Sequence, residues 1–66
     1  MVIGGNAAFY LARDRIVAKN KKDYDTADKI RNFIIKGGWR VEDREEGTII
    51  IRNYPYKCYL VKNKNI

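Results

Sequence analysis

The chain has no histidine, a single cysteine and no long apolar run, and each absence argues against a class of function. Without histidine the usual zinc-ligand spacings cannot form, and Cys58 has no imidazole to activate it as a nucleophile. Cys58 also lacks a second cysteine for an internal disulfide, so we expect a reduced thiol buried in the core. No stretch approaches the roughly 20 apolar residues of a membrane span, and the N-terminus lacks a signal-peptide pattern. We therefore expect no metal site, no cofactor, no enzyme activity, no membrane partner and a cytoplasmic location.

Length and charge limit the remaining possibilities. The 66 residues are enough for one small domain, residues 1–66, which buries only about 60% of its unfolded surface. Fourteen Lys and Arg residues against eight Asp and Glu residues give a formal net charge of +6. Such an excess favours polyanionic partners such as nucleic acid, although ordinary basic proteins share it.

The hydrophobic pattern predicts two helices followed by three strands. Residues 1–5 form a flexible lead-in, and Asn6 is the expected cap of a helix over residues 7–19. A second helix is expected over residues 24–36, with Asp23 as its cap and Gly37 as its left-handed stop, so that residues 6–36 form a helical hairpin. The expected core stripes of the two helices are Phe9, Ala12 and Ile16, and Ala27, Ile30, Phe33 and Ile34.

After the glycines the apolar period changes to two, which is typical of strands. Residues 39–43, 48–52 and 56–62 are the expected strands, so residues 39–62 form a β-meander. The predicted fold class is α+β, a two-helix antiparallel hairpin packed on a small three-stranded antiparallel sheet, in the order ααβββ. Trp39 is expected to fill the core between the helices and the sheet.

Three chemically different side chains fall on one stripe of the second helix. Tyr24, Asp28 and Arg31 are spaced i, i+4, i+7, which places them within roughly 60° around the helix axis. A phenol ring can stack on a base, a carboxylate can accept hydrogen bonds from base amino groups, and a guanidinium can donate two hydrogen bonds. Asp43 could add an acceptor from the sheet. The simpler reading is an ordinary surface ion pair between Asp28 and Arg31, worth about 0.2–0.5 kcal/mol.

Two further groups of residues suit a nucleic acid strand. Lys19, Lys21 and Lys22, near the break between the helices, could bind phosphates. Tyrosines and lysines also alternate near the C-terminus, as on a single-strand binding face, although a packed sheet uses tyrosine equally well. The residues of this second group are Tyr54, Tyr56, Lys57, Tyr59 and Lys62.

The stretch from Leu11 to Arg52, about two thirds of the chain, resembles the C-terminal anticodon-recognition module of bacterial cysteinyl-tRNA synthetases. The resemblance lies in Lys22-Asp23-Tyr24, Ala27-Asp28, Ile30-Arg31, Val41-Glu42-Asp43 and Gly47-Thr48, which occur in the family's order. It implies that Tyr24, Asp28, Arg31 and Asp43 contact the anticodon and that Lys19 stands at a basic contact position. The family usually has tryptophan at the position of Tyr24 and arginine at that of Lys19, and many members end near Asn53.

The resemblance implies an RNA-binding module for the anticodon arm of tRNA-Cys, either an excised domain or a stand-alone protein, without the synthetase's catalytic domain. The alternative is a protein–protein interaction module, an inhibitor or assembly factor, that uses the sheet edge and the aromatic C-terminus. The sequence predicts that Lys19, Lys21, Lys22, Tyr24, Asp28, Arg31 and Asp43 bind RNA.

Overall fold

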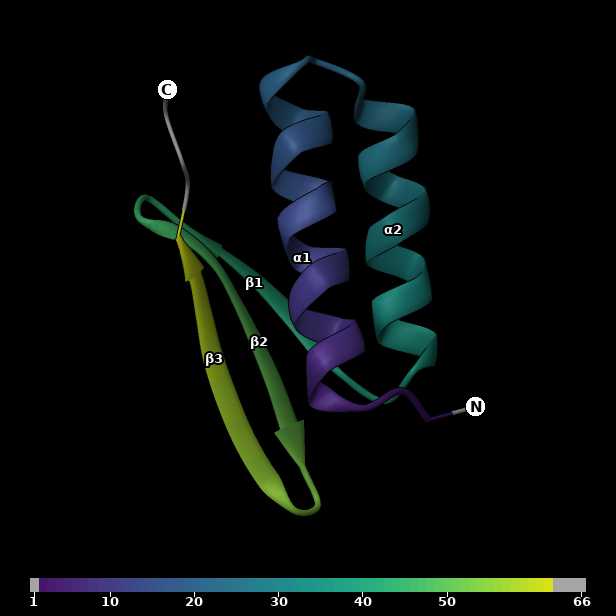
Figure 1. Ribbon diagram of the computed structural model, residues 1–66, viewed down its shortest axis with the longest axis vertical. Coiled ribbons are helices and arrows are strands. Elements are labelled where there is room, and N and C mark those ends of the chain that lie inside the picture. Colours follow the sequence, from purple (N-terminus) through teal and green to yellow (C-terminus); the bar gives the residue numbers. More distant parts are fainter. Residues whose placement is uncertain (1, 63–66) are drawn as a thin grey trace.

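The computed structural model describes residues 2–62 and confirms the predicted order of two helices and three strands. Helices α1 (Gly5–Asn20) and α2 (Tyr24–Lys36) lie side by side and antiparallel (Figure 1). Strands β1 (Arg40–Arg44), β2 (Gly47–Asn53) and β3 (Tyr56–Lys62) form an antiparallel sheet in the order β1-β2-β3. Helix α1 packs on β2 and β3, and α2 contacts β1. The fold is therefore α+β, with both helices packed against the sheet.

The core lies between the helix hairpin and the sheet, with Trp39 at its centre. Trp39 is only 1% exposed, its indole Nε1 donates a 3.0 Å hydrogen bond to the Ile3 carbonyl, and its ring lies 6.0 Å from that of Tyr59. This confirms the predicted core role of Trp39. The Ile3 amide in turn donates to the Gly37 carbonyl, so the lead-in is held to the end of α2 at Ile3. The buried cluster consists of Ala8, Ala12, Ile16, Ile34, Trp39, Ile50 and Val61.

Three local predictions near the helix ends and on α2 are wrong. Helix α1 begins at Gly5, and its N-cap is Gly4, which makes no side-chain cap hydrogen bond. The left-handed residue after α2 is Gly38, at φ 95°, because Gly37 still donates its amide to carbonyls of the last helical turn. Phe33 is 45% exposed, since it lies about 100° around the axis from the buried Ile34.

The two faces of the sheet differ, and this corrects the expectation for Cys58. Ile50 pairs with Tyr59 on the face that packs against the helices, whereas Ile51 pairs with Cys58 on the opposite face. Because side chains alternate along a strand, Cys58 points away from the helices. It is therefore an exposed thiol and not a core residue.

Candidate functional site

Arg15 and Asp43 form an ion pair that joins α1 to the end of β1. The guanidinium donates from Nη1 to Asp43 Oδ1 at 2.7 Å and from Nη2 to Oδ2 at 3.1 Å. The Arg15 side chain is 6% exposed, but that of Asp43 is 49% exposed. The Thr48 hydroxyl donates to Asp43 Oδ1 at 3.3 Å and accepts from Arg15 at 3.4 Å. We call Arg15, Asp43 and Thr48 the Asp43 cluster. This geometry fixes the orientation of a carboxylate that solvent or a ligand can still reach.

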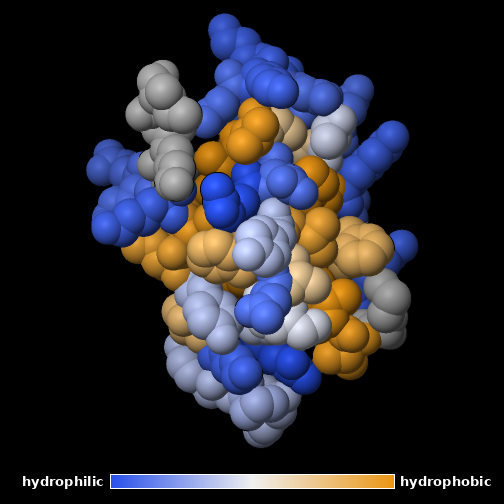
Figure 2. All heavy atoms as spheres, viewed as in Figure 1, coloured by the Kyte–Doolittle hydropathy of each residue, from blue (hydrophilic) through white to orange (hydrophobic). Residues whose placement is uncertain are grey.

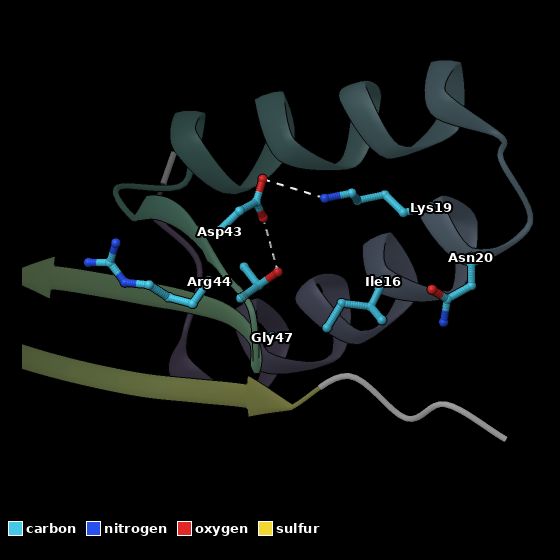
Figure 3. Close-up of a pocket in the computed structure, with 7 residues that line it drawn as sticks. Ile16, Lys19, Asn20, Asp43, Arg44 and Gly47 are labelled. Atoms are coloured by element: carbon cyan, nitrogen blue, oxygen red, sulfur yellow. Dashed lines mark hydrogen bonds and ion pairs between the residues drawn. The ribbon is translucent and has the colours of Figure 1, made fainter.

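Lys19 supplies a second cation to the same carboxylate. It lies one helical turn beyond Arg15, and its Nζ is 3.5 Å from Asp43 Oδ2 (Figure 3). A cavity of about 100 Å³ opens beside the pair, between the C-terminal half of α1 and the turn joining β1 to β2. The hydrogen bonds from Arg15, with the positive charges of Arg15 and Lys19, lower the pKa of Asp43 from 3.8 to about 2, against the opposing effect of burial. Asp43 is therefore ionised at neutral pH and serves as a hydrogen-bond acceptor.

The stripe of Tyr24, Asp28 and Arg31 lies on the surface of α2. Tyr24 is 57% exposed, and Asp28 and Arg31 are also exposed. The helix that carries them starts at Asp23, whose side chain accepts hydrogen bonds from the amide and hydroxyl of Thr26. Among residues 2–62, neither Asp28 nor Arg31 is in an ion pair, so the simpler reading of a surface salt bridge between them does not describe this structure.

Helix geometry places this stripe on the side of α2 that is remote from the outer groove between the helices. That groove is lined by Asp14 and Lys21 together with Thr26 and Ile30, which belong to the opposite flank of α2. Tyr24, Asp28 and Arg31 lie about 100° or more around the axis from Ile30. Likewise on α1, Arg15 and Lys19 lie about 100° or more around the axis from Asp14 and point toward β1. Both the stripe and the Asp43 cluster therefore lie away from the outer groove.

The structure does not bring all three predicted lysines together. Lys19 belongs to the last turn of α1 and contacts Asp43. Lys21 and Lys22 are exposed in the turn that follows, and Lys21 lines the outer groove beside Asp14, on the other side of the hairpin. Only Lys19 therefore joins the Asp43 cluster.

Sequence reasoning missed Arg15, which holds Asp43 in place. Arg15 lies three residues after Ala12 and seven after Ala8, both fully buried, so it occupies the apolar face of α1. An arginine at such a position requires an acidic partner, because an unpaired buried charge is costly. An arginine on the apolar face of a helix therefore predicts a buried ion pair, and this was the signal in the sequence that could have identified Arg15.

Other kinds of site find no support in the part of the chain described. Residues 2–62 contain no group of three or more histidine, cysteine or acidic side chains that could hold a metal ion. No helix within the same range has the length and apolar content needed to cross a membrane.

Comparison with known proteins reveals one local similarity. A stretch of 34 residues, 52% of this chain, is 56% identical to the cysteine–tRNA ligase of Wolbachia pipientis subsp. Culex pipiens (strain wPip). A stretch of the same length is 53% identical to the cysteine–tRNA ligase of Wolbachia sp. subsp. Brugia malayi (strain TRS). These stretches span only 7% and 8% of the two ligases. No family model and no solved structure matches the chain. Half of the chain is therefore similar to a small part of a cysteine–tRNA ligase.

Proposed function

We propose that this chain is a non-catalytic RNA-binding domain, formed by residues 1–66, that recognises the anticodon arm of tRNA-Cys. The observation that carries the proposal is the exposed stripe of Tyr24, Asp28 and Arg31, which has no ion-pair partner among residues 2–62 and, like the Asp43 cluster, lies away from the outer groove. The similarity to part of a cysteine–tRNA ligase supports tRNA-Cys as the RNA.

Each residue has a role that fits its chemistry. The Tyr24 ring stacks on an unpaired base, and Asp28 and Arg31 hydrogen-bond to base edges. Asp43 adds a fixed acceptor, since a carboxylate offers about four lone-pair sites and Arg15 and Thr48 occupy three of them. Lys19, whose side chain is 39% exposed, moves from Asp43 to a phosphate when RNA binds. Lys21 and Lys22 add general electrostatic attraction.

Fluorescence anisotropy tests the proposal with three labelled RNAs: tRNA-Cys, a tRNA-Cys with an altered anticodon, and a random single strand. We expect the tightest binding to unaltered tRNA-Cys. Loss of a stacking or base-reading contact by Tyr24→Ala or Asp28→Asn should weaken that binding by about 1–3 kcal/mol. The matched control is Asp14→Asn, which removes an exposed carboxylate from the outer groove. Equal affinity for all three RNAs would leave only non-specific electrostatic binding and would refute the proposal.

The second candidate is a protein-binding module, and the exposure of β3 is the observation that favours it. Six of the seven residues of β3 are exposed, and β3 is an edge strand whose backbone is open to pairing with another chain. The salt dependence of the binding affinity distinguishes the RNA-binding function from the protein-binding one. RNA affinity should fall steeply as salt rises because counterions are released, whereas strand addition by a protein should change little.

A further inference from the structure

The turn between β2 and β3 carries a second group of cationic and aromatic side chains, far from the Asp43 cluster. We define the hairpin tip as Arg52, Tyr54, Tyr56 and Lys57. Asp43 pairs with Thr48 at one end of β2, and the tip lies at the other end, about 16 Å along the strand at roughly 3.3 Å per residue. The hairpin extends past the start of α1 (Figure 1).

The tip's aromatic residues are exposed rather than packed. Tyr54 is 89% exposed and Tyr56 is 69% exposed. In contrast, Tyr59 packs against Trp39 and lies under the first residue of α1, where a Cβ on Gly5 would meet its hydroxyl at 3.2 Å. The sequence left open whether these tyrosines form the core or a binding face. The structure separates Tyr59, which packs, from Tyr54 and Tyr56, which project into solvent.

The tip's charges are all positive and are placed at an electrostatic cost. Arg52 and Lys57 are directly opposite each other on β2 and β3, so their side chains leave the same face of the sheet. Like charges at such positions repel, and among residues 2–62 neither side chain has an acidic partner. Arg52 instead lies 5.9 Å from the centre of the Trp39 ring. All eight acidic residues precede Gly47, so residues 47–66 carry four basic residues and no acidic one.

The surrounding surface is open and mixed in character. A hollow of about 250 Å³ lies beside the tip, lined by Arg40, Arg52, Asn53 and Tyr54 together with Val2, Gly38 and Ile51. Figure 2 shows hydrophilic residues, in dark and pale blue, at the end of the molecule where the hairpin tip lies, with the orange hydrophobic residues farther up. A protein-docking surface usually has an apolar centre, whereas cations interleaved with exposed aromatic rings suit a single nucleic acid strand.

We propose that the hairpin tip is a second RNA-binding surface, which takes an unpaired segment of RNA. Arg52 and Lys57 pair with successive phosphates, and the exposed ring of Tyr54, in the turn beyond them, stacks on a base, while Tyr56 offers a second ring on the opposite face of the sheet. The proposal rests on the RNA-binding function proposed above and extends it, because it requires a strand that reaches beyond the α2 stripe. At about 3.4 Å per stacked nucleotide, the 16 Å along β2 corresponds to about five nucleotides.

The salt dependence of binding to a polyuridine strand tests the cationic part of this surface. The double variant Arg52→Gln/Lys57→Gln should reduce the slope of log affinity against log salt by about 1.4, since each single-strand phosphate contact contributes about 0.7. The matched control is Lys29→Gln/Lys36→Gln, which removes the same two charges from the outer face of α2. If the control reduces the slope as much as the tip variant does, general charge explains the binding and the proposal is overturned.

The aromatic part is tested with Tyr54→Ala/Tyr56→Ala on the same RNA. Loss of stacking should weaken affinity by about tenfold and leave the salt slope unchanged. Thermal melting monitored by circular dichroism confirms that each variant is folded. If Arg52→Gln/Lys57→Gln is unstable, the single variant Lys57→Gln, which leaves Arg52 beside Trp39, replaces it in the salt experiment. Unchanged affinity in the tyrosine variant would overturn the stacking role.

The results also separate this proposal from the one on which it rests. If Tyr24→Ala weakens binding to tRNA-Cys and no tip variant affects any RNA, the anticodon proposal stands and the tip proposal fails. If the tip variants weaken RNA binding and Tyr24→Ala does not, the tip is a binding surface and the α2 stripe is not. A wild-type chain that binds no RNA would overturn both.

Discussion

Replacing Asp43 by asparagine leaves the buried charge of Arg15 without its counterion, and the cost can be worked out from the geometry. The fall of the Asp43 pKa from 3.8 to about 2 corresponds to about 2.4 kcal/mol at 1.36 kcal/mol per pKa unit. Because the Asp43 side chain is 49% exposed, solvent screening reduces this to about 1 kcal/mol. The guanidinium of Arg15 is 6% exposed, and its loss of a charged acceptor is already contained in this figure, because the pKa shift measures the whole interaction of the Asp43 charge with its surroundings.

We therefore expect Asp43→Asn to lower the free energy of unfolding by about 1–2 kcal/mol. A chain of this length is stable by about 3–10 kcal/mol at the usual 0.05–0.15 kcal/mol per residue, so the loss is large. Urea unfolding followed by tryptophan fluorescence measures it directly, because Trp39 is the only tryptophan and is buried.

A double-mutant cycle isolates the pair itself. Arg15→Met removes the buried charge and retains apolar bulk, so the double variant with Asp43→Asn should be more stable than the two single losses predict, by about 1–2 kcal/mol. The control cycle uses Arg44→Met and Glu42→Gln, because Arg44 and Glu42 also lie 2.7 Å apart but are 56% and 30% exposed. That pair should show a coupling of about 0.2–1 kcal/mol. Equal coupling energies in the two cycles would refute the argument that burial of Arg15 strengthens its ion pair.

Two further measurements test the same corner of the molecule. Because the pKa of Asp43 is lower in the folded chain, its contribution to stability is fully present above about pH 4 and is lost as pH falls toward 2. Urea unfolding at a series of pH values should show this loss of about 1 kcal/mol in the wild type and not in Asp43→Asn, and parallel curves would contradict it. Gly47→Ala should destabilise the chain by more than about 2 kcal/mol, since a Cβ at Gly47 would overlap the carbonyl oxygen of Val61. Gly4→Ala, where a Cβ would meet nothing within 4 Å, is the control, and similar stability of the two variants would refute the steric argument.

Much of the fold follows from local features that the sequence displays. The change of apolar period after Gly38 marks the change from helix to strand, and Asp23 caps α2 as predicted because its carboxylate needs only an amide three residues away. The strand limits were predicted within a residue or two for the same reason. The exposed stripe on α2 was also predictable in its geometry, since three residues at i, i+4, i+7 share one side of any helix. Its binding role stays a prediction.

The tertiary structure alone decided which side chains meet. Arg15 and Asp43 are 28 residues apart, and their pairing depends on how α1 packs against the sheet, which no local pattern specifies. The exposure of Cys58 and Phe33 was likewise unpredictable, because apolar side chains on an outer face look the same in sequence as those on an inner one. The sequence by itself therefore determined the elements and the excess of positive charge. Packing determined that Asp43 is held by a buried cation and that two exposed tyrosines and two cations without an acidic partner among residues 2–62 lie at the far end of the sheet.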